Sequence, residues 1–135
     1  MALKISDLSV GDWVQDNFGD YIKVAGIWQG HNLNYQVDIL RDGVIGTCLP
    51  CNIHPIPITA EILETNGLEY VDDGNDAVIF LCCDMFWARL CVGDTFWQVG
   101  IHSEDRLYAV VCDVKHTHQL QHALRLAGVE KEINL

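Results

Sequence analysis

Short apolar runs separated by tight turns are the pattern that most constrains the fold of this chain. Residues 33–39 alternate between apolar and polar side chains, and such alternation predicts a strand with one buried face. Arg41-Asp-Gly43 after it predicts a hairpin turn. Comparable runs predict further strands at residues 12–15, 21–28, 44–47, 77–83, 86–91, 95–99 and 107–112. Strands at this spacing predict antiparallel sheets.

Two helices are predicted besides the strands. The first covers residues 60–66, with Thr59 as its N-cap and Gly67 closing it. The second lies between His116 and Gly128, with Thr117 as N-cap and Gly128 just past its end.

The second helix separates its apolar and polar residues onto opposite faces. At about 100° per residue, one face carries only apolar side chains and is expected to pack on a sheet. That face contains Leu120, Ala123, Leu124 and Ala127. The opposite face is expected to point outward and is the candidate partner-binding surface. It contains His118, Gln121, His122 and Arg125.

These elements predict an α+β protein in two parts. Residues 1–48 are expected to form an SH3-like small β-barrel, because several short strands at this spacing are typical of one. Residues 49–135 then hold a connector with Pro50, Pro55 and Pro57, the short helix, and a second antiparallel sheet covered by the C-terminal helix. An arrangement of both parts in one compact domain is the alternative.

Composition excludes several classes of protein. The chain has 135 residues with a formal net charge of −11, and so acidic a chain is not expected to bind nucleic acid directly, since that binding depends on Lys and Arg neutralising phosphates. No apolar run approaches the roughly 20 residues of a membrane helix. The N-terminus lacks the apolar core of a signal peptide, so a cytoplasmic location is expected.

Cysteine and histidine spacing offers two weak metal sites. Cys48, Cys51 and His54 have C-x2-C-x2-H spacing, but zinc needs four ligands and the fourth is not local. His118 and His122 are four residues apart on the helix, where Arg125 on the same face repels a cation. Free thiols, with neither metal nor cofactor, are the expectation for a cytoplasmic chain.

The sequence also resembles small uncharacterised proteins of Bacteroides-type bacteria and of their phages and mobile elements. The resemblance is spread over most of the chain. It is carried by Gly11-Asp-Trp-Val14, Lys23-Val-Ala-Gly-Ile27, Pro55-Ile-Pro-Ile-Thr59, Glu61-Ile-Leu63, Asn66-Gly67, His118-Gln-Leu-Gln121 and Ala123-Leu124. It implies an origin in such an element, and no activity.

No motif for nucleophilic catalysis or phosphate binding is present in the sequence. The leading hypothesis is therefore a non-catalytic protein-interaction module that binds a protein partner or a second copy of itself. The first alternative is an acidic decoy that imitates DNA and occupies a DNA-binding protein. The second is an enzyme whose site the sequence does not reveal.

Overall fold

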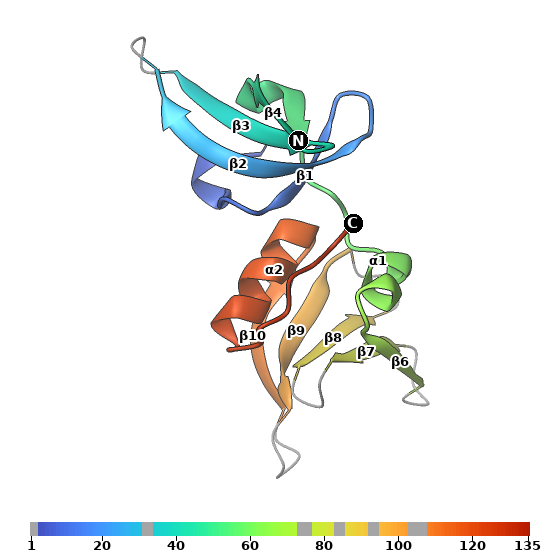
Figure 1. The fold of residues 1–135 in the computed structure, drawn as a ribbon. Helices are drawn as coiled ribbons and strands as arrows, with labels where there is room; N and C mark the ends of the chain where they lie inside the picture. Colours follow the sequence, from blue (N-terminus) through green and yellow to red (C-terminus); the bar gives the residue numbers. More distant parts are fainter. Residues whose placement is uncertain (1–2, 31–33, 73–76, 83–85, 92–94, 103–107) are drawn as a thin grey trace. The chain divides into compact units, whose positions relative to one another are not determined.

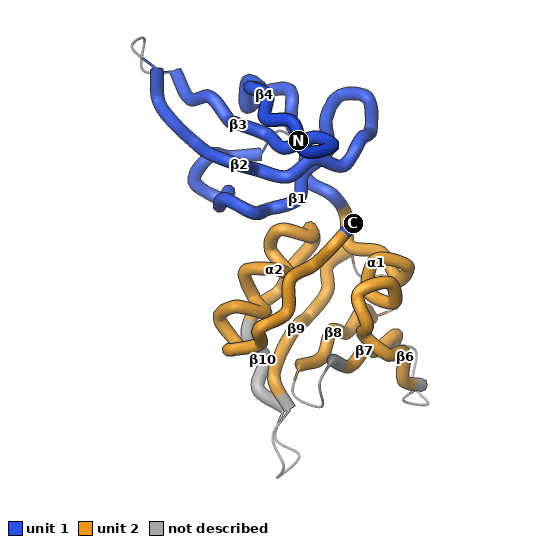
Figure 2. Tube along the Cα trace, in the orientation of Figure 1, with its two compact units in different colours: residues 1–56, 135 blue, residues 57–134 orange. Residues whose placement is uncertain are grey.

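A computed structural model of the chain describes residues 3–30, 34–72, 77–82, 86–91, 95–102 and 108–135. The fold is α+β, with two antiparallel sheets and a C-terminal helix (Figure 1). The chain divides into two compact units, residues 1–56 with residue 135, and residues 57–134 (Figure 2). The division lies further along the chain than the boundary expected after residue 48.

Unit 1 is a five-stranded antiparallel sheet with the order β4-β3-β2-β1-β5. Its strands are β1 (Trp13–Asp16), β2 (Tyr21–Gln29), β3 (Tyr35–Arg41), β4 (Val44–Cys48) and β5 (Ile53–His54). Two 3-10 turns accompany them, η1 (Ile5–Asp7) and η2 (Pro50–Asn52). The predicted hairpin between β3 and β4 is confirmed, since Asp42 and Gly43 both have positive φ (49° and 81°), as a type I′ turn requires.

Strand β5 explains why unit 1 extends past the expected boundary. Its residues Ile53 and His54 pair with Asp16 and Gln15 of β1, so the start of the proline-rich connector belongs to this sheet. Because β5 is an edge strand, the prolines around it remove no bond from the ladder. Strands β4 and β5 are the two edges of the sheet. The sheet is therefore not closed, and the predicted SH3-like barrel is not confirmed.

The core of unit 1 consists of the inward residues of this sheet. Alternate positions along the strands are buried together with Leu8, as the sequence alternation predicts. The buried strand residues are Val14, Ile22, Val24, Val37, Ile39 and Ile53.

Unit 2 holds a second five-stranded antiparallel sheet, in the order β10-β9-β8-β7-β6. Its strands are β6 (Glu69–Asp72), β7 (Ala77–Cys82), β8 (Phe86–Cys91), β9 (Trp97–His102) and β10 (Tyr108–Val114). Strand β6 was missed by the sequence analysis because it is a short edge strand with acidic residues at both ends. In β7, which the sequence predicts at residues 77–83, Phe80 is buried whereas Val78, Ile79 and Leu81 are half-buried.

Helix α1 (Ala60–Thr65) has the predicted caps. The Thr59 hydroxyl accepts a hydrogen bond from the Ile62 N–H at 3.2 Å, and Gly67 has a φ of +83°. Ile62 and Leu63 are buried. The side chain of Asn66, the residue at the C-terminal cap, is buried as well.

Helix α2 (Thr117–Leu126) begins one residue earlier than predicted, because its N-cap is His116 and not Thr117. The Gln119 side-chain oxygen accepts the N–H groups of His116 (3.1 Å) and Lys115 (2.8 Å). A glutamine at this position satisfies N–H groups that have no partner within the helix. Gly128, with a φ of +77°, lies just past the end as predicted.

The predicted apolar face of α2 is confirmed, but the predicted outer face is wrong for two residues. Leu120, Ala123 and Leu124 are buried, and α2 contacts β10. His118 and Gln121, expected to face outward, are only 2% and 4% exposed. The reason for Gln121 is the C-terminal tail, residues 129–134, which folds back over this side of α2 and hydrogen-bonds to Gln121.

The burial of α2 gives a stability prediction. Leu124→Ala should reduce the free energy of unfolding by roughly 2–5 kcal/mol, through lost transfer energy and a residual cavity. Gln121→Ala should cost about 1–3 kcal/mol, because it leaves buried main-chain groups of the tail without their partner. Arg125→Ala, an exposed control on the same helix, should stay within about ±0.5 kcal/mol. Chemical denaturation measures all three, and equal effects of Gln121→Ala and Arg125→Ala would contradict the assignment.

Candidate interaction surface

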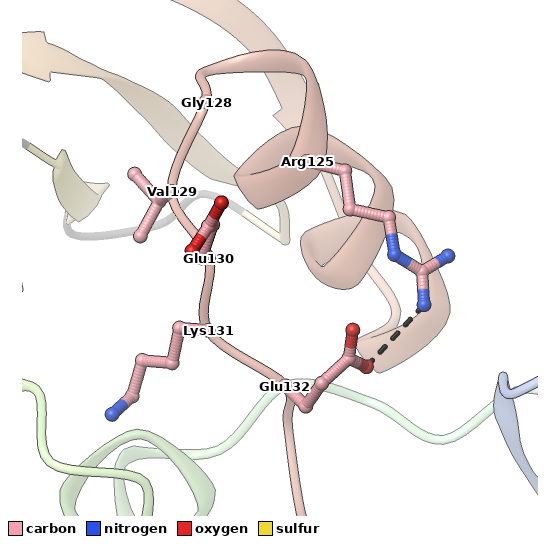
Figure 3. A pocket seen from close by; sticks show the side chains of 6 residues that line it. All are labelled: Arg125, Gly128, Val129, Glu130, Lys131 and Glu132. Carbon is pink, nitrogen blue, oxygen red and sulfur yellow. Dashed lines mark hydrogen bonds and ion pairs between the residues drawn. The ribbon is translucent and has the colours of Figure 1, made fainter.

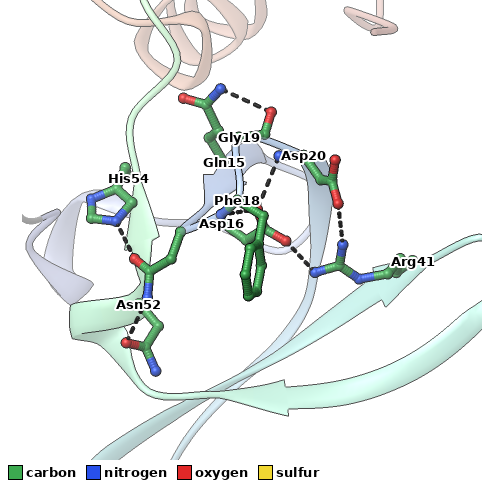
Figure 4. A network of polar contacts seen from close by, with 9 residues as sticks. Gln15, Asp16, Phe18, Gly19, Asp20, Arg41, Asn52 and His54 are labelled. Carbon is green, nitrogen blue, oxygen red and sulfur yellow. Dashed lines mark hydrogen bonds and ion pairs between the residues drawn. The ribbon is translucent and has the colours of Figure 1, made fainter.

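The turn between β1 and β2 is held by an unusual number of polar contacts (Figure 4). One carboxylate oxygen of Asp16 accepts the N–H groups of Phe18 (2.8 Å) and Asp20 (2.9 Å). The Gln15 side-chain amide donates to the carbonyl of Gly19 at 3.0 Å, and Gly19 has a φ of +87°. These bonds define the path of the turn residue by residue, so its tip is a fixed structure.

Arg41 links this turn to strand β3. Its guanidinium forms ion pairs with Asp16 and, at 3.0 Å, with Asp20. The Asp16 side chain is 6% exposed. The hydrogen bond from Arg41 lowers the pKa of Asp16, burial opposes this, and the N–H groups of Asp20 and Phe18 add to the lowering. Asp16 is therefore a charged acceptor shared by the turn and by β3.

Phe18, at the tip of the fixed turn, is 90% exposed. Its ring contributes almost nothing to the core, although the turn that carries it is held by residues of two strands, Gln15 and Asp16 of β1 and Arg41 of β3. Solvent-exposed Phe is not rare by itself. An exposed aromatic on a hydrogen-bonded turn is the kind of group that anchors an interface, since the backbone that carries it has little freedom left to lose on binding and Phe has only two side-chain torsions.

Other exposed apolar side chains lie at the same end of the sheet. Val44 (69% exposed) pairs with Arg41, and Ile45 (66% exposed) pairs with Leu40. Tyr21, half exposed, begins β2 directly after the turn. Val44 and Ile45 follow one another in β4 and therefore point to opposite faces of the sheet. Tyr21 and Ile45 both lie on the outer face, opposite the core residues Ile22 and Ile39, and we name the set Phe18, Tyr21 and Ile45 the Phe18 surface. Its polar rim is the Arg41–Asp20 ion pair.

The outer face of the sheet continues from this surface. Cross-strand pairing places Trp13, Lys23, Leu40 and Ile45 in one row across β1 to β4. The Lys23 ammonium lies 5.5 Å from the centre of the Trp13 ring, a cation–π distance. The row is apolar except for Lys23, and it reaches the Phe18 surface at Ile45.

Strand β4 adds an open hydrogen-bonding edge to the same region. Within the described part of the chain it pairs only with β3, and Val44–Thr47 are exposed. It carries no charged residue or proline, which are the usual protections of an edge strand. A further strand could therefore pair with β4 by main-chain hydrogen bonds.

The partner-binding residues predicted from the sequence do not form one exposed surface. His118 and Gln121 are buried, His122 is half-buried, and only Arg125 is exposed. The rings of His116 and His122 lie 5.9 Å from that of His118, centre to centre. Burial, with the charge of Lys115, lowers the pKa of His116. These histidines form a packed cluster and not an outward stripe.

The predicted alternative metal ligands are engaged with other groups. The His54 ring nitrogen lies 2.7 Å from the Asn17 side-chain oxygen. Cys51 is exposed and lies 3.8 Å from the Asn52 side-chain oxygen, whereas Cys48 packs against the core of unit 1. Among the residues that the structure describes, no group of three or more His, Cys, Asp or Glu side chains is placed to hold a metal ion.

A partly open pocket of 490 Å³ lies beside the end of α2 (Figure 3). It is lined by Arg125 and the start of the tail, Gly128–Glu132. Arg125 and Glu132 form an ion pair across it at 3.3 Å. An enclosed apolar pocket with a few convergent polar groups is the usual form of a small-molecule site, and this hollow, walled by exposed charged residues, does not have that form.

No helix in the described ranges is long and apolar enough to cross a membrane. No protein-family model matches the chain, and no curated protein or solved structure was found to be similar to it. The case for a function therefore depends on the geometry of the chain itself.

The Asp16–Arg41 pair predicts a pH dependence. Because folding lowers the pKa of Asp16, the stabilisation is complete above about pH 4, the ordinary carboxyl value, and is lost as pH falls through the folded-state pKa. Arg41→Met should raise that pKa and move acid unfolding of unit 1 to higher pH. Lys23→Met, which removes the same charge from the same sheet, is the control. NMR titration of the Asp16 carboxyl measures the effect, and equal shifts in both variants would contradict it.

The cysteine geometry makes a second prediction. Protein purified without added metal should contain much less than one zinc per chain, because Cys48, Cys51 and His54 lie on separate elements with other neighbours. Elemental analysis of the purified chain measures this. One tightly held zinc per chain, lost in a Cys48→Ser/Cys51→Ser variant, would show that the three residues do bind metal.

Proposed function

We propose that the protein is a non-catalytic protein-interaction module that binds a partner protein through the Phe18 surface. The observation that carries the proposal is Phe18, 90% exposed at the tip of a turn fixed by Asp16 and Arg41. Apolar patches that are exposed and rimmed by polar groups mark interaction sites on soluble proteins. Because the turn backbone is already held by hydrogen bonds, binding at Phe18 costs little ordering of the loop.

The chemistry around Phe18 selects the kind of partner. Phe18 stands between Asp16 and Asp20 in the sequence. Arg41 pairs with both carboxylates, so the turn keeps a net negative charge, and of the two only Asp20 is largely exposed. A partner with an apolar pocket rimmed by Lys or Arg would complement this arrangement, whereas an anionic lipid surface would be repelled. The net charge of −11 supports faster association with such a partner. The open edge of β4 lets the partner extend the contact by adding a strand.

The proposed architecture of unit 1 is that of an SH3-like module. The strand order β4-β3-β2-β1-β5 and the 3-10 turn η2 between β4 and β5 support it. A mobile-element origin and a cytoplasmic location remain part of the proposal, the first from the sequence resemblance and the second from the composition. A fold of this type hosts many functions, so the site and not the fold carries the proposal.

The test uses two apolar residues that are both almost fully exposed. A photo-reactive phenylalanine analogue replaces Phe18 in one variant and Leu126 (79% exposed) in the other. A protein that crosslinks only at position 18 is then purified, and its affinity is measured by titration. Phe18→Ala should weaken binding by about 2 kcal/mol or more, roughly thirtyfold, as at an interface hot spot. Leu126→Ala should bind normally.

Stability measurements separate binding from folding. Because both side chains are exposed, both variants should unfold within about ±0.5 kcal/mol of the parent. Equal affinity of Phe18→Ala and the parent would refute the proposal. If the affinity instead falls steeply with salt concentration and is unchanged by Phe18→Ala, the result would favour the acidic decoy, whose binding depends on carboxylates. Ile45→Lys, which places a charge on the β4 edge, tests whether a strand is added there.

A further inference from the structure

The C-terminal tail of unit 2, residues 129–134, is held by side-chain amides and not by a strand. The Gln121 amide donates to the Lys131 carbonyl at 2.9 Å and accepts the Ile133 N–H at 2.6 Å. The Asn66 amide donates to the Asn134 carbonyl at 2.9 Å and accepts the Asn134 N–H at 2.7 Å. Each buried amide thus satisfies a donor and an acceptor of the tail backbone.

Only two side chains of the tail are inserted into unit 2. Val129 is 8% exposed and Ile133 is 1% exposed, whereas Glu130 and Glu132 point to solvent. Glu132 also meets Arg125 at 3.3 Å. The tail runs between α2 and α1 (Figure 1), so Gln121 from α2 and Asn66 from α1 reach it from two sides. We name these contacts, with Arg125, the tail site.

The chemistry of the tail site recognises a backbone more than a sequence. A carboxamide bonds equally well to the N–H and C=O groups of any residue, so Gln121 and Asn66 select the path of the chain. Selectivity comes from two buried apolar side chains, four positions apart, and from one carboxylate that faces Arg125. Peptide-binding domains combine main-chain hydrogen bonds and alternate side-chain pockets in the same way.

We propose that the tail site is a peptide-binding site whose resident ligand is the chain's own tail. Its other ligand is a short segment of a partner protein with apolar residues at the first and fifth positions and a carboxylate at the fourth. The tail leaves the helix at Gly128, whose φ of +77° permits the change of direction, and no strand pairing ties residues 129–134 to the sheet. A competing segment has to replace the contacts described above and the hydrogen bond from the Val129 N–H to the Leu124 carbonyl (2.9 Å). This site is in unit 2 and is separate from the Phe18 surface.

The first experiment uses the unmodified chain. A synthetic acetylated peptide, Val-Glu-Lys-Glu-Ile-Asn-Leu, copies residues 129–135 and is added at millimolar concentration, because the attached tail competes at a high effective concentration. Hydrogen exchange is then followed at the Ile133 and Asn134 amides. Displacement of the tail should accelerate both, and the same peptide with Asp in place of its Ile should leave both unchanged.

The second experiment removes the tail from the site by a substitution in the tail itself. Ile133→Asp in the full chain should release the tail, and a fluorescent copy of the peptide should then bind at least about tenfold more tightly than to the parent chain, a difference of roughly 1.4 kcal/mol. Adding Gln121→Ala should weaken that binding by about tenfold or more, whereas adding Leu126→Ala, outside the site, should not.

The two experiments together decide the proposal. If Ile133→Asp stays folded by circular dichroism and binds no peptide, the tail site accepts only its attached tail and the proposal is wrong. If that variant unfolds, the hydrogen-exchange experiment decides alone, and unchanged exchange at Ile133 and Asn134 refutes the proposal. Neither result bears on Phe18, so this proposal and the proposed function fail independently.

Discussion

Irregular backbone has no ladder or helix to pair its N–H and C=O groups, and in both units a buried polar side chain supplies the missing partners. In unit 1, Asp16 accepts two N–H groups of the β1–β2 turn that are not paired in the sheet. In unit 2, Asn66 and Gln121 serve the tail in the same way. Each of these side chains is buried. Without Asn66 and Gln121, buried backbone groups of the tail would have no partner, at a cost comparable to a lost hydrogen bond each. The turn residues that Asp16 holds are themselves exposed, so Asp16 acts there by setting the path of the turn.

Local chemistry made most of the secondary structure predictable from the sequence. The hairpin at Asp42-Gly43 needs positive φ at two residues, and the helix at Ala60–Thr65 needs an oxygen at Thr59; both signals are read within a few residues. The short strand β6 has no such signal, because Glu69–Asp72 is acidic at both ends and is a strand only through its pairing with β7. Closure of a barrel is not local either, which is why strand spacing could not decide it.

The candidate site was less predictable because it depends on contacts distant in sequence. A helical projection of α2 assumes one covered side and one open side, yet the tail covers a second side and buries Gln121. Nothing local in Asn17-Phe-Gly-Asp20 shows that the turn is fixed and leaves Phe18 exposed. That property comes from Arg41, which joins Asp16 and Asp20 from a strand more than twenty residues away.

The contrast between Phe18 and Ile133 shows how the two proposed sites differ physically. Phe18 is an apolar group that the fold holds in water, so a partner can gain binding free energy simply by covering it. Ile133 is an apolar group that is already buried. The binding free energy of a competing peptide is therefore only the difference between the free energy of its own contacts and that of the tail contacts it replaces. Affinity at the Phe18 surface should therefore follow the apolar area that a partner covers. Affinity at the tail site should instead follow how firmly the chain's own tail is held, which makes Gln121 and Asn66 determinants of both stability and competition.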